Sequence, residues 1–362
     1  MENGTIDLSE RSRVRYNGNH RKRLQFTTIH RKGRLLVTVT QKEAGDSGLS
    51  TAKKAIFTFG LIAGGYGLMK QLKANENRHE SKAVVILGSG RSGTSVLARA
   101  VNIAGVDLGD TFIGTNETNP KGFFENNKIV RVHNKISRKL KRRPFPYRFD
   151  IRKTIKPLRD DLKQYMEDKF ADKPLWGWKD PRTNDFLPMW KRILKELNAE
   201  GHYLIIVRNP IDVVASYKRA YNRDETWARL QWQFRTLTAL RETKNEKRII
   251  VEYEDLFNNS LSCIKRIMQT FGLPWSEDEL SMKRKLDAFI DPNLQRSDSG
   301  TDVEAFRKRE DVAPDVKELY LLCLEGARQP STLQTKPFQA KVDLLYKEYL
   351  RKYGELSVLP PK

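Results

Sequence analysis

The sequence predicts an α/β fold in which a central parallel sheet is flanked by helices. Three short runs are apolar throughout and rich in β-branched side chains, as is typical of strands buried on both faces: residues 83–87 (AVVIL), 203–207 (YLIIV) and 249–251 (IIV). Helical patterns occupy the stretches between and around the later runs: 185–197, 210–221 and 226–240. Strands that alternate with helices favour a parallel sheet, whose ligands bind at the carboxyl ends of its strands.

The composition is that of a globular protein with an excess of basic residues. The 362 residues are 38% hydrophobic and 31% charged, and this length suits one large domain with extensions or two domains. A net charge of +22, from 67 Lys and Arg against 45 Asp and Glu, favours an anionic partner such as nucleic acid, an anionic membrane or a phosphorylated small molecule. The sequence shows no zinc-ligand spacing, RNA-recognition signature or basic zipper, so no specific nucleic-acid partner is expected.

The first 54 residues are polar and basic. Segments 23–29 and 35–40 could pair as a hairpin, but a lone hairpin is marginal in water, so a largely mobile tail is expected. The two cysteines, Cys263 and Cys323, cannot form a disulfide framework, which indicates a reducing compartment such as the cytoplasm.

Residues 55–69 (AIFTFGLIAGGYGLM) are apolar and contain four glycines. Since a membrane span needs about 20 apolar residues, a short helix is expected here, docked on the folded domain or lying at a membrane surface, with a true span as the alternative. The expected organisation is therefore this helix and a polar linker at 55–81, the main domain at 82–300 and its helical extension at 301–362. The amphipathic stretch 342–353 (VDLLYKEYLRKY) supports the extension.

A glycine-rich sequence, Gly-Ser-Gly-Arg-Ser-Gly-Thr-Ser at 88–95, directly follows the first predicted strand. Glycines let a backbone curl around an anion, and the N–H groups and dipole of the following helix attract it. Gly88 and Gly93 have the spacing of the phosphate loop G-x-x-x-x-G-K-[ST], but Thr94 replaces the lysine that reaches the outer phosphates of a nucleoside triphosphate. The nearest cation is Arg91, so the loop predicts a phosphate site without that specialised lysine.

A second anion site is predicted at the end of the second strand. Asn209 is suited to cap the next helix, Pro210 to its first position and Asp212 to its first turn. Arg208 therefore sits at the strand's carboxyl end and Ser216 almost two turns into the helix, where a guanidinium and a hydroxyl could both bind a phosphate.

These two elements together resemble sulfotransferases that use 3′-phosphoadenosine 5′-phosphosulfate (PAPS), which have a P-loop NTPase-like fold. Their pattern is a strand followed by [KR]-S-G-[TS]-[TS] and later a strand followed by R-x₇-S. Blocks similar to carbohydrate-type and bacterial members also occur, and the resemblance covers roughly 82–300: 119–126 (NPKGFFEN), 178–182 (WKDPR) and 253–256 (YEDL). The resemblance implies that the loop holds the 5′-phosphosulfate and the later pair the 3′-phosphate, with these donor-binding residues: Gly90, Arg91, Ser92, Gly93, Thr94, Ser95, Arg208 and Ser216.

Sulfuryl transfer needs in-line geometry, stabilisation of the leaving oxygen and a base for the acceptor hydroxyl. Arg91 is expected to stabilise the leaving 5′-phosphate by charge and bidentate hydrogen bonding, because arginine cannot give up its proton as lysine can. The small-molecule cytosolic branch has lysine at this position, whereas carbohydrate-type members have arginine. The resemblance implies neither a metal ion nor a covalent intermediate.

Three side chains are candidates for the base. Glu125 is favoured, on residue type and on its place in the block that resembles acceptor-side residues; its structural alternative is a carboxylate that stabilises a helix N-terminus. His133 on the following helix and Asp180 are the other candidates, with Asp180 equally suited to a polar turn after a strand. Lys179 and Arg182 could hold the donor or an anionic acceptor.

The resemblance to carbohydrate-type members makes a glycan or glycolipid hydroxyl the expected acceptor, with a lipid, a metabolite or a tyrosine as alternatives. Two other functions fit parts of the sequence. A small-molecule P-loop kinase would need the missing loop lysine and a magnesium carboxylate. A non-catalytic binder of nucleic acid or of a membrane surface would use the basic charge alone.

Overall fold

The chain divides into two compact units, residues 1–77 and 78–362. The computed structural model describes these residues: 22–31, 34–43, 53–60, 81–139, 155–275, 277–291 and 302–354. In the first unit three strands form an antiparallel sheet in the order β1 (Lys22–Arg31), β2 (Arg34–Glu43) and β3 (Lys53–Gly60).

The third strand corrects the expectation of a helix that begins at residue 55. Residues 55–60, expected to begin a helix, pair with β2 in the register that runs from Gln41↔Lys53 to Arg34↔Gly60. The sequence Ala-Ile-Phe-Thr-Phe at 55–59 is β-branched and aromatic, which favours a strand. The predicted hairpin of β1 and β2 is therefore not isolated, because β3 adds a third strand to it. Residues 61–80, the rest of the expected helix and linker, lie outside the described residues.

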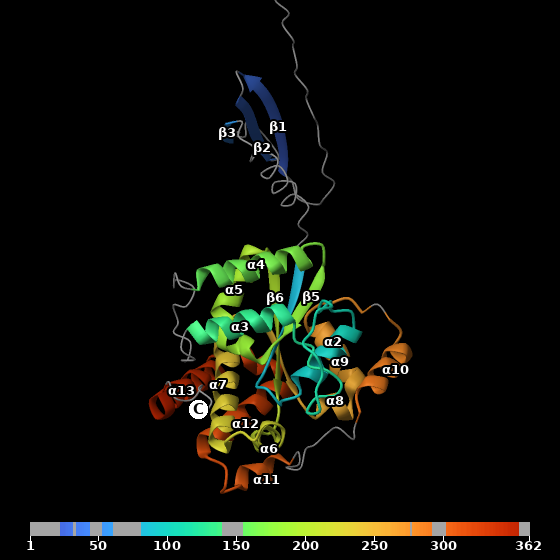
Figure 1. Ribbon diagram of the computed structural model, residues 1–362, viewed down its shortest axis with the longest axis vertical. Helices are drawn as coiled ribbons and strands as arrows, with labels where there is room; N and C mark the ends of the chain where they lie inside the picture. The colour runs from blue at the N-terminus through green and yellow to red at the C-terminus, as the bar shows by residue number, and fades with distance from the viewer. Residues whose placement is uncertain are drawn as a thin grey trace, which may run out of the picture. The chain divides into compact units, whose positions relative to one another are not determined.

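The second unit contains a four-stranded sheet in the order β5 (Leu175–Lys179), β4 (Ser81–Leu87), β6 (Ala199–Val207) and β7 (Lys247–Glu252). All three neighbouring pairs are parallel, which confirms the predicted α/β fold. Figure 1 shows this sheet between layers of helices. Because β4 lies between β5 and β6, the loop after β4 lies between the carboxyl ends of two other strands.

Alternate residues of the strands enter two separate cores. Along β4, Ala83, Val85 and Leu87 face one core, and Val84 and Ile86 face the other, so the uninterrupted apolar run reflects burial on both faces. The helices of the second core are α2 (Thr94–Ile103), α9 (Ser260–Thr270) and α10 (Glu279–Phe289). The helices of the first core are α3 (Asn127–Lys139), α4 (Lys156–Phe170), α5 (Leu187–Glu196), α6 (Pro210–Tyr221), α7 (Glu225–Glu242), α11 (Val303–Lys308), α12 (Pro314–Arg328) and α13 (Lys336–Tyr353).

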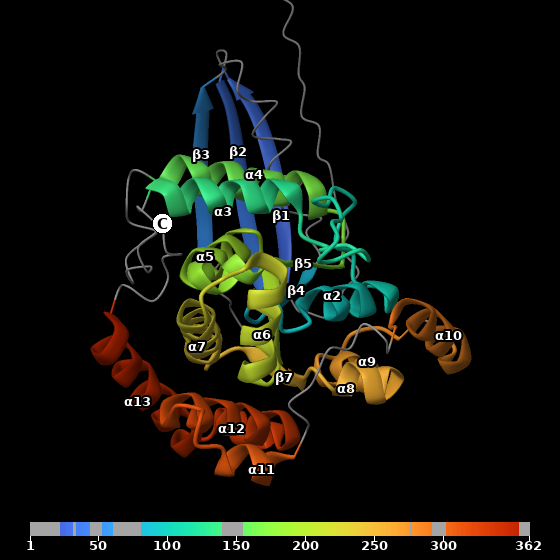
Figure 2. The same cartoon turned by 60° about the horizontal axis from the view of Figure 1, so that its bottom comes forward.

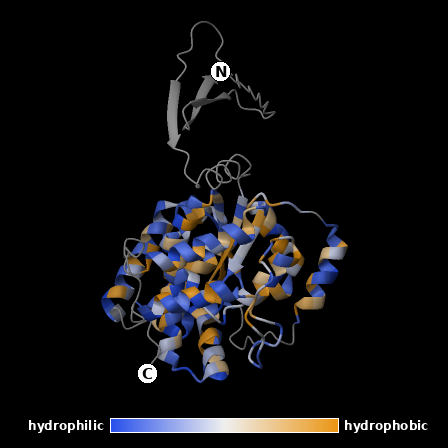
Figure 3. Cartoon of the chain, turned by 45° about the horizontal axis from the view of Figure 1, so that its top comes forward, coloured by the Kyte–Doolittle hydropathy of each residue, from blue (hydrophilic) through white to orange (hydrophobic). Residues whose placement is uncertain are grey.

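The last helices of the chain pack onto the second unit. Helix α12 lies against β7 and α13 lies against α7, as Figure 2 shows. Figure 3 shows that the helices carry both hydrophilic and hydrophobic residues. The remaining short elements are η2 (Pro181–Phe186), α8 (Asp255–Asn258) and η4 (Pro330–Gln334). Among the described residues, no helix combines the length and the apolar character that a membrane span requires.

Candidate functional site

The loop after β4 has a backbone that glycine alone accommodates at two positions. Gly88 and Gly93 have φ angles of 141° and 88°. A Cβ atom at Gly88 would lie 2.8 Å from the carbonyl oxygen of Ile206, and one at Gly93 would lie 2.4 Å from the ring of Tyr253. Gly93 is the residue before α2, so the loop delivers the chain directly to a helix N-terminus. The result is the strand, tight loop and helix that a phosphate site requires.

Inside this loop, Arg91 itself has a left-handed backbone, with φ 68°. Its Nε donates to Ser216 Oγ at 3.0 Å and its Nη2 to the carbonyl of Thr118 at 3.4 Å. The buried Ser92 Oγ has no hydrogen-bond partner among the described residues. A buried hydroxyl without a partner is costly, and an anion bound in the loop could supply one.

The loop after β6 meets the loop after β4. Asn209 Oδ1 accepts from the Ile211 N–H, which caps α6 as the sequence predicts. Arg208 Nη1 donates to the carbonyl of Arg91 at 3.1 Å, and its guanidinium lies 4.2 Å from the ring centre of Tyr253. The two predicted anion sites are therefore adjacent, because β4 and β6 are neighbours in the sheet.

Lys179 occupies the corresponding position at the end of β5. The side chain is 2% exposed, and its Nζ donates to Ser95 Oγ at 3.1 Å, to the Phe123 carbonyl at 3.0 Å and to Glu125 Oε1 at 2.7 Å. A buried ammonium is stable only when its three protons are satisfied in this way. Lys179 thus joins the phosphate loop, through Ser95, to the favoured base, Glu125.

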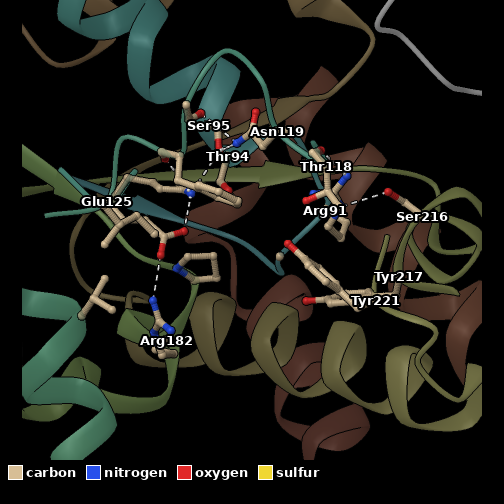
Figure 4. Close-up of a pocket in the computed structure, with 18 of the residues that line it drawn as sticks. Arg91, Thr94, Ser95, Thr118, Asn119, Glu125, Arg182, Ser216, Tyr217 and Tyr221 are labelled. Carbon is tan, nitrogen blue, oxygen red and sulfur yellow. Dashed lines mark hydrogen bonds and ion pairs between the residues drawn. The ribbon is translucent and has the colours of Figure 1, made fainter. Parts of the chain in front are cut away.

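Glu125 is held from a second side by Arg182. Arg182 Nη2 donates to Glu125 Oε2 at 2.7 Å, so each carboxylate oxygen accepts one bond from a cation. A carboxylate can accept about four hydrogen bonds, so both oxygens of Glu125 retain the capacity to accept one from a hydroxyl. In Figure 4 Glu125 and Arg182 lie at one side of a cavity and Arg91 and Ser216 at the other.

Asp180 lies beneath Arg182 and has no exposed surface. Its Oδ1 accepts from Arg182 Nε at 2.8 Å and its Oδ2 from His133 Nδ1 at 2.8 Å. Trp190 Nε1 donates to His133 Nε2 at 2.9 Å, which places the remaining proton of the imidazole on Nδ1. Burial alone would raise the pKa of Asp180, but the Arg182 guanidinium, together with the hydrogen bond from His133, holds that pKa well below its usual range.

This geometry separates the three candidate bases. Both nitrogens of His133 are engaged, the side chain is fully buried, and neither His133 nor Asp180 lines the cavity. Hydrogen bonds join His133 to Asp180 and Asp180 to Arg182, an arrangement that suits positioning of Arg182, and the identity of the base stays a prediction. Glu125 is the candidate that reaches the cavity.

Asp180→Asn is expected to lower the free energy of unfolding by about 3–5 kcal/mol at pH 7, because it removes one partner of a buried ion pair. Since the folded-state pKa of Asp180 lies below its usual value of 3.8, the wild-type advantage should persist down to about that pH and disappear on further acidification. Denaturant unfolding followed by tryptophan fluorescence would measure this in the second unit alone, since all six tryptophans follow residue 170. The control, Asp160→Asn, breaks an exposed pair with Lys156 and should cost under about 1 kcal/mol; equal losses would contradict the prediction.

The cavity that these groups line has a volume of about 1100 Å³, and its lining includes ten basic and four acidic side chains. It contains almost every donor-site residue named from the sequence: Gly90, Arg91, Gly93, Thr94, Ser95, Arg208 and Ser216, with Glu125, Lys179 and Arg182. Arg91 differs from expectation in one respect, since its guanidinium lies beside Ser216, at the predicted 3′-phosphate site. Among the described residues, no cluster of three or more His, Cys, Asp and Glu side chains is arranged to hold a metal ion.

Sequence reasoning missed one set of cavity residues, the basic side chains Arg131, Lys135 and Arg138 on α3. Their spacing of four and three residues places them on one helix face. This spacing can be read from the sequence. Whether this face of α3 borders the cavity depends on how the helix packs in the folded protein.

Comparison with known proteins gives a match over more than half of the chain. The protein-family model described as "Sulfotransferase family" matches residues 83–277, which include the phosphate loop, Glu125, Lys179 and Ser216. A search of curated proteins finds no match.

Among solved structures, the chain is similar to the sulfotransferase domain from the curacin biosynthetic pathway, with 16% identity and a TM-score of 0.37 over 79% of this chain and 100% of that one. It is also similar to the sulfotransferase domain of the Synechococcus PCC 7002 olefin synthase, with 17% identity and a TM-score of 0.33 over 75% and 96% of the two chains. Sulfotransferase STF1 from Mycobacterium tuberculosis H37Rv has 10% identity and a TM-score of 0.32 over 60% and 75%. On the extent of the family match, the chain belongs to the sulfotransferase family.

Proposed function

We propose that the chain transfers a sulfuryl group from PAPS to a hydroxyl group of a carbohydrate or glycolipid. The observation that carries the proposal is one cavity lined at one side by the adjacent loops after β4 and β6, with Arg91 and Arg208, and at the other by a carboxylate paired with two cations. The first feature suits a nucleotide with separated phosphates, and the second suits activation of a hydroxyl.

In the proposed donor complex, Arg208, Ser216 and the Arg91 guanidinium bind the 3′-phosphate. The loop from Ser92 to Ser95 and the N-terminus of α2 bind the 5′-phosphosulfate. Lys179, bonded to Ser95 Oγ, places an ammonium group beside the sulfuryl group. The donor thereby spans the carboxyl ends of β4 and β6, the edge where ligands of parallel sheets bind.

The proposed reaction is an in-line displacement at sulfur. The acceptor oxygen forms a bond to sulfur as Glu125 takes the hydroxyl proton, and the bond from sulfur to the 5′-phosphate oxygen breaks. Negative charge then develops on that leaving oxygen, where the loop N–H groups and Lys179 can stabilise it. The products are the sulfated acceptor and adenosine 3′,5′-bisphosphate.

Nucleotide binding provides the first test. Adenosine 3′,5′-bisphosphate at about 100 times its Kd should raise the melting temperature by about 5 °C or more without added metal. AMP and ATP with Mg²⁺ should protect less, and Arg208→Ala should abolish the advantage of the bisphosphate. Protection by ATP with Mg²⁺ alone would instead support a kinase.

Activity provides the second test. Radiolabelled sulfate should pass from PAPS to a pool of glycans with the wild-type chain and not with Arg208→Ala. Equal transfer by both proteins would show that Arg208 does not hold the 3′-phosphate.

A further inference from the structure

The polar face of α3 carries an unusual concentration of positive charge. The helix Asn127–Lys139 has five basic residues and no acidic residue. Its buried face consists of Ile129, Val130, Val132, His133 and Ile136. The opposite face exposes Arg131, Lys135 and Arg138, which also line the cavity; we refer to these three residues as the α3 stripe.

The α3 stripe is not neutralised by its surroundings. Among the residues that the structure describes, no ion pair or hydrogen bond involves these three side chains, whereas Lys128 on the same helix pairs with Asp161 at 2.8 Å. Like charges spaced by four residues destabilise a helix, and a bound polyanion would remove that cost.

The side of the cavity that contains Glu125 has no such excess of positive charge. There Lys179 and Arg182 are balanced by Glu125 and Asp180. Arg91 and Arg208 lie at the other side of the cavity, at the proposed donor site. The α3 stripe belongs to neither of these two groups of charges.

The position of the stripe relative to Glu125 indicates what it binds. Glu125 comes immediately before Asn126, whose side chain accepts from the Lys128 and Ile129 N–H groups at the start of α3. With a rise of about 1.5 Å per residue, the Cα atoms of the stripe lie about 6 to 17 Å along the axis from Asn127. An acceptor with its hydroxyl at Glu125 would therefore place any acidic groups one to three helical turns away beside these cations.

We infer that the acceptor is an acidic glycan chain whose carboxylate or sulfate groups bind Arg131, Lys135 and Arg138 while one hydroxyl reaches Glu125. This inference rests on the proposed function and specifies its acceptor class. An extended glycan suits the stripe because the three side chains line a cavity that leads to the base. A membrane surface would require a convex, solvent-facing patch in place of a cavity wall.

Binding of matched oligosaccharides tests the inference. Hexasaccharides of heparosan, chondroitin and hyaluronan would be titrated with the full chain and saturating adenosine 3′,5′-bisphosphate, each beside its carboxyl-reduced counterpart, which keeps the hydroxyls and loses the charge. At least one acidic hexasaccharide should bind about 10- to 100-fold more tightly than its reduced form, and the difference should shrink as salt is raised.

The triple variant Arg131→Gln, Lys135→Gln, Arg138→Gln should lose this preference and keep its affinity for the bisphosphate. The control triple variant Lys156→Gln, Lys163→Gln, Lys169→Gln removes the same charge from α4, outside the cavity, and should behave as wild type.

Equal binding of acidic and reduced glycans, or a preference that survives in the α3 variant, would overturn the inference. Tighter, α3-dependent binding of phosphatidylserine vesicles or duplex DNA than of any glycan would overturn the choice of occupant. Failure of the wild-type chain to bind the bisphosphate would instead contradict the proposed function. Failure of the acceptor inference and failure of the proposed function are therefore distinguishable.

Discussion

Glu125→Gln is expected to lower kcat by about 10²- to 10⁴-fold while the affinity for adenosine 3′,5′-bisphosphate changes little. A positioned base contributes about this factor to proton transfer. The glutamine keeps the size of the side chain and one oxygen that can accept from Lys179 or Arg182, but it cannot take the acceptor's proton. The measurement is steady-state transfer from PAPS over a range of pH, together with calorimetric titration of the bisphosphate.

Comparison of kcat with ligand binding separates a chemical role from a structural one. Loss of a base should lower kcat and leave bisphosphate binding unchanged, whereas a disturbed cavity should weaken both. Glu117→Gln provides a matched control, because Glu117 also lines the cavity and lies outside the group of paired charges. A Glu125→Gln enzyme with wild-type kcat would show that another group accepts the proton.

Arg91→Ala is expected to weaken binding of adenosine 3′,5′-bisphosphate by about 10- to 100-fold and to leave binding of AMP within about threefold. The hydrogen bond of Arg91 to Ser216 places its guanidinium at the proposed 3′-phosphate site, and hydrogen bonds to charged groups are worth about 1.5–3 kcal/mol. The two nucleotides differ only in the 3′-phosphate, so the ratio of their affinities isolates the contact. Isothermal titration of both ligands to both proteins measures it.

An equal loss of affinity for both nucleotides would place Arg91 at the other phosphate. If Arg91→Ala weakens both nucleotides equally, Arg91 binds the 5′-phosphate, as the resemblance to other sulfotransferases implies, and Lys179 is not the principal cation at the reacting sulfur. Arg223→Ala is the control for loss of one positive charge, since Arg223 lines the same cavity and lies over Trp227, 5.4 Å from the ring centre.

Much of the second unit's fold follows from local sequence. The run at 83–87 is apolar at every position, so it could be placed as a strand buried on both faces, as it is in β4. Helix α6 begins at Pro210, because Asn209 and Pro210 form a capping signal that depends on a few neighbouring residues. The tight loop could also be predicted, because Gly88 and Gly93 stand in the sequence directly after the strand. Both have the positive φ angles that glycine adopts readily.

The sequence by itself therefore determined the α/β class, the tight glycine loop after β4 and the start of α6, because each depends on residues close together in the chain. Only the tertiary structure decided that β5 lies beside β4, which brings Lys179 to Ser95 and Glu125. It also decided that Trp190, 57 positions from His133 in sequence, donates a hydrogen bond to the second imidazole nitrogen. Hydrogen-bond partners and burial depend on packing between segments that are distant in the chain. The pattern of neighbouring residues in one sequence does not predict that packing.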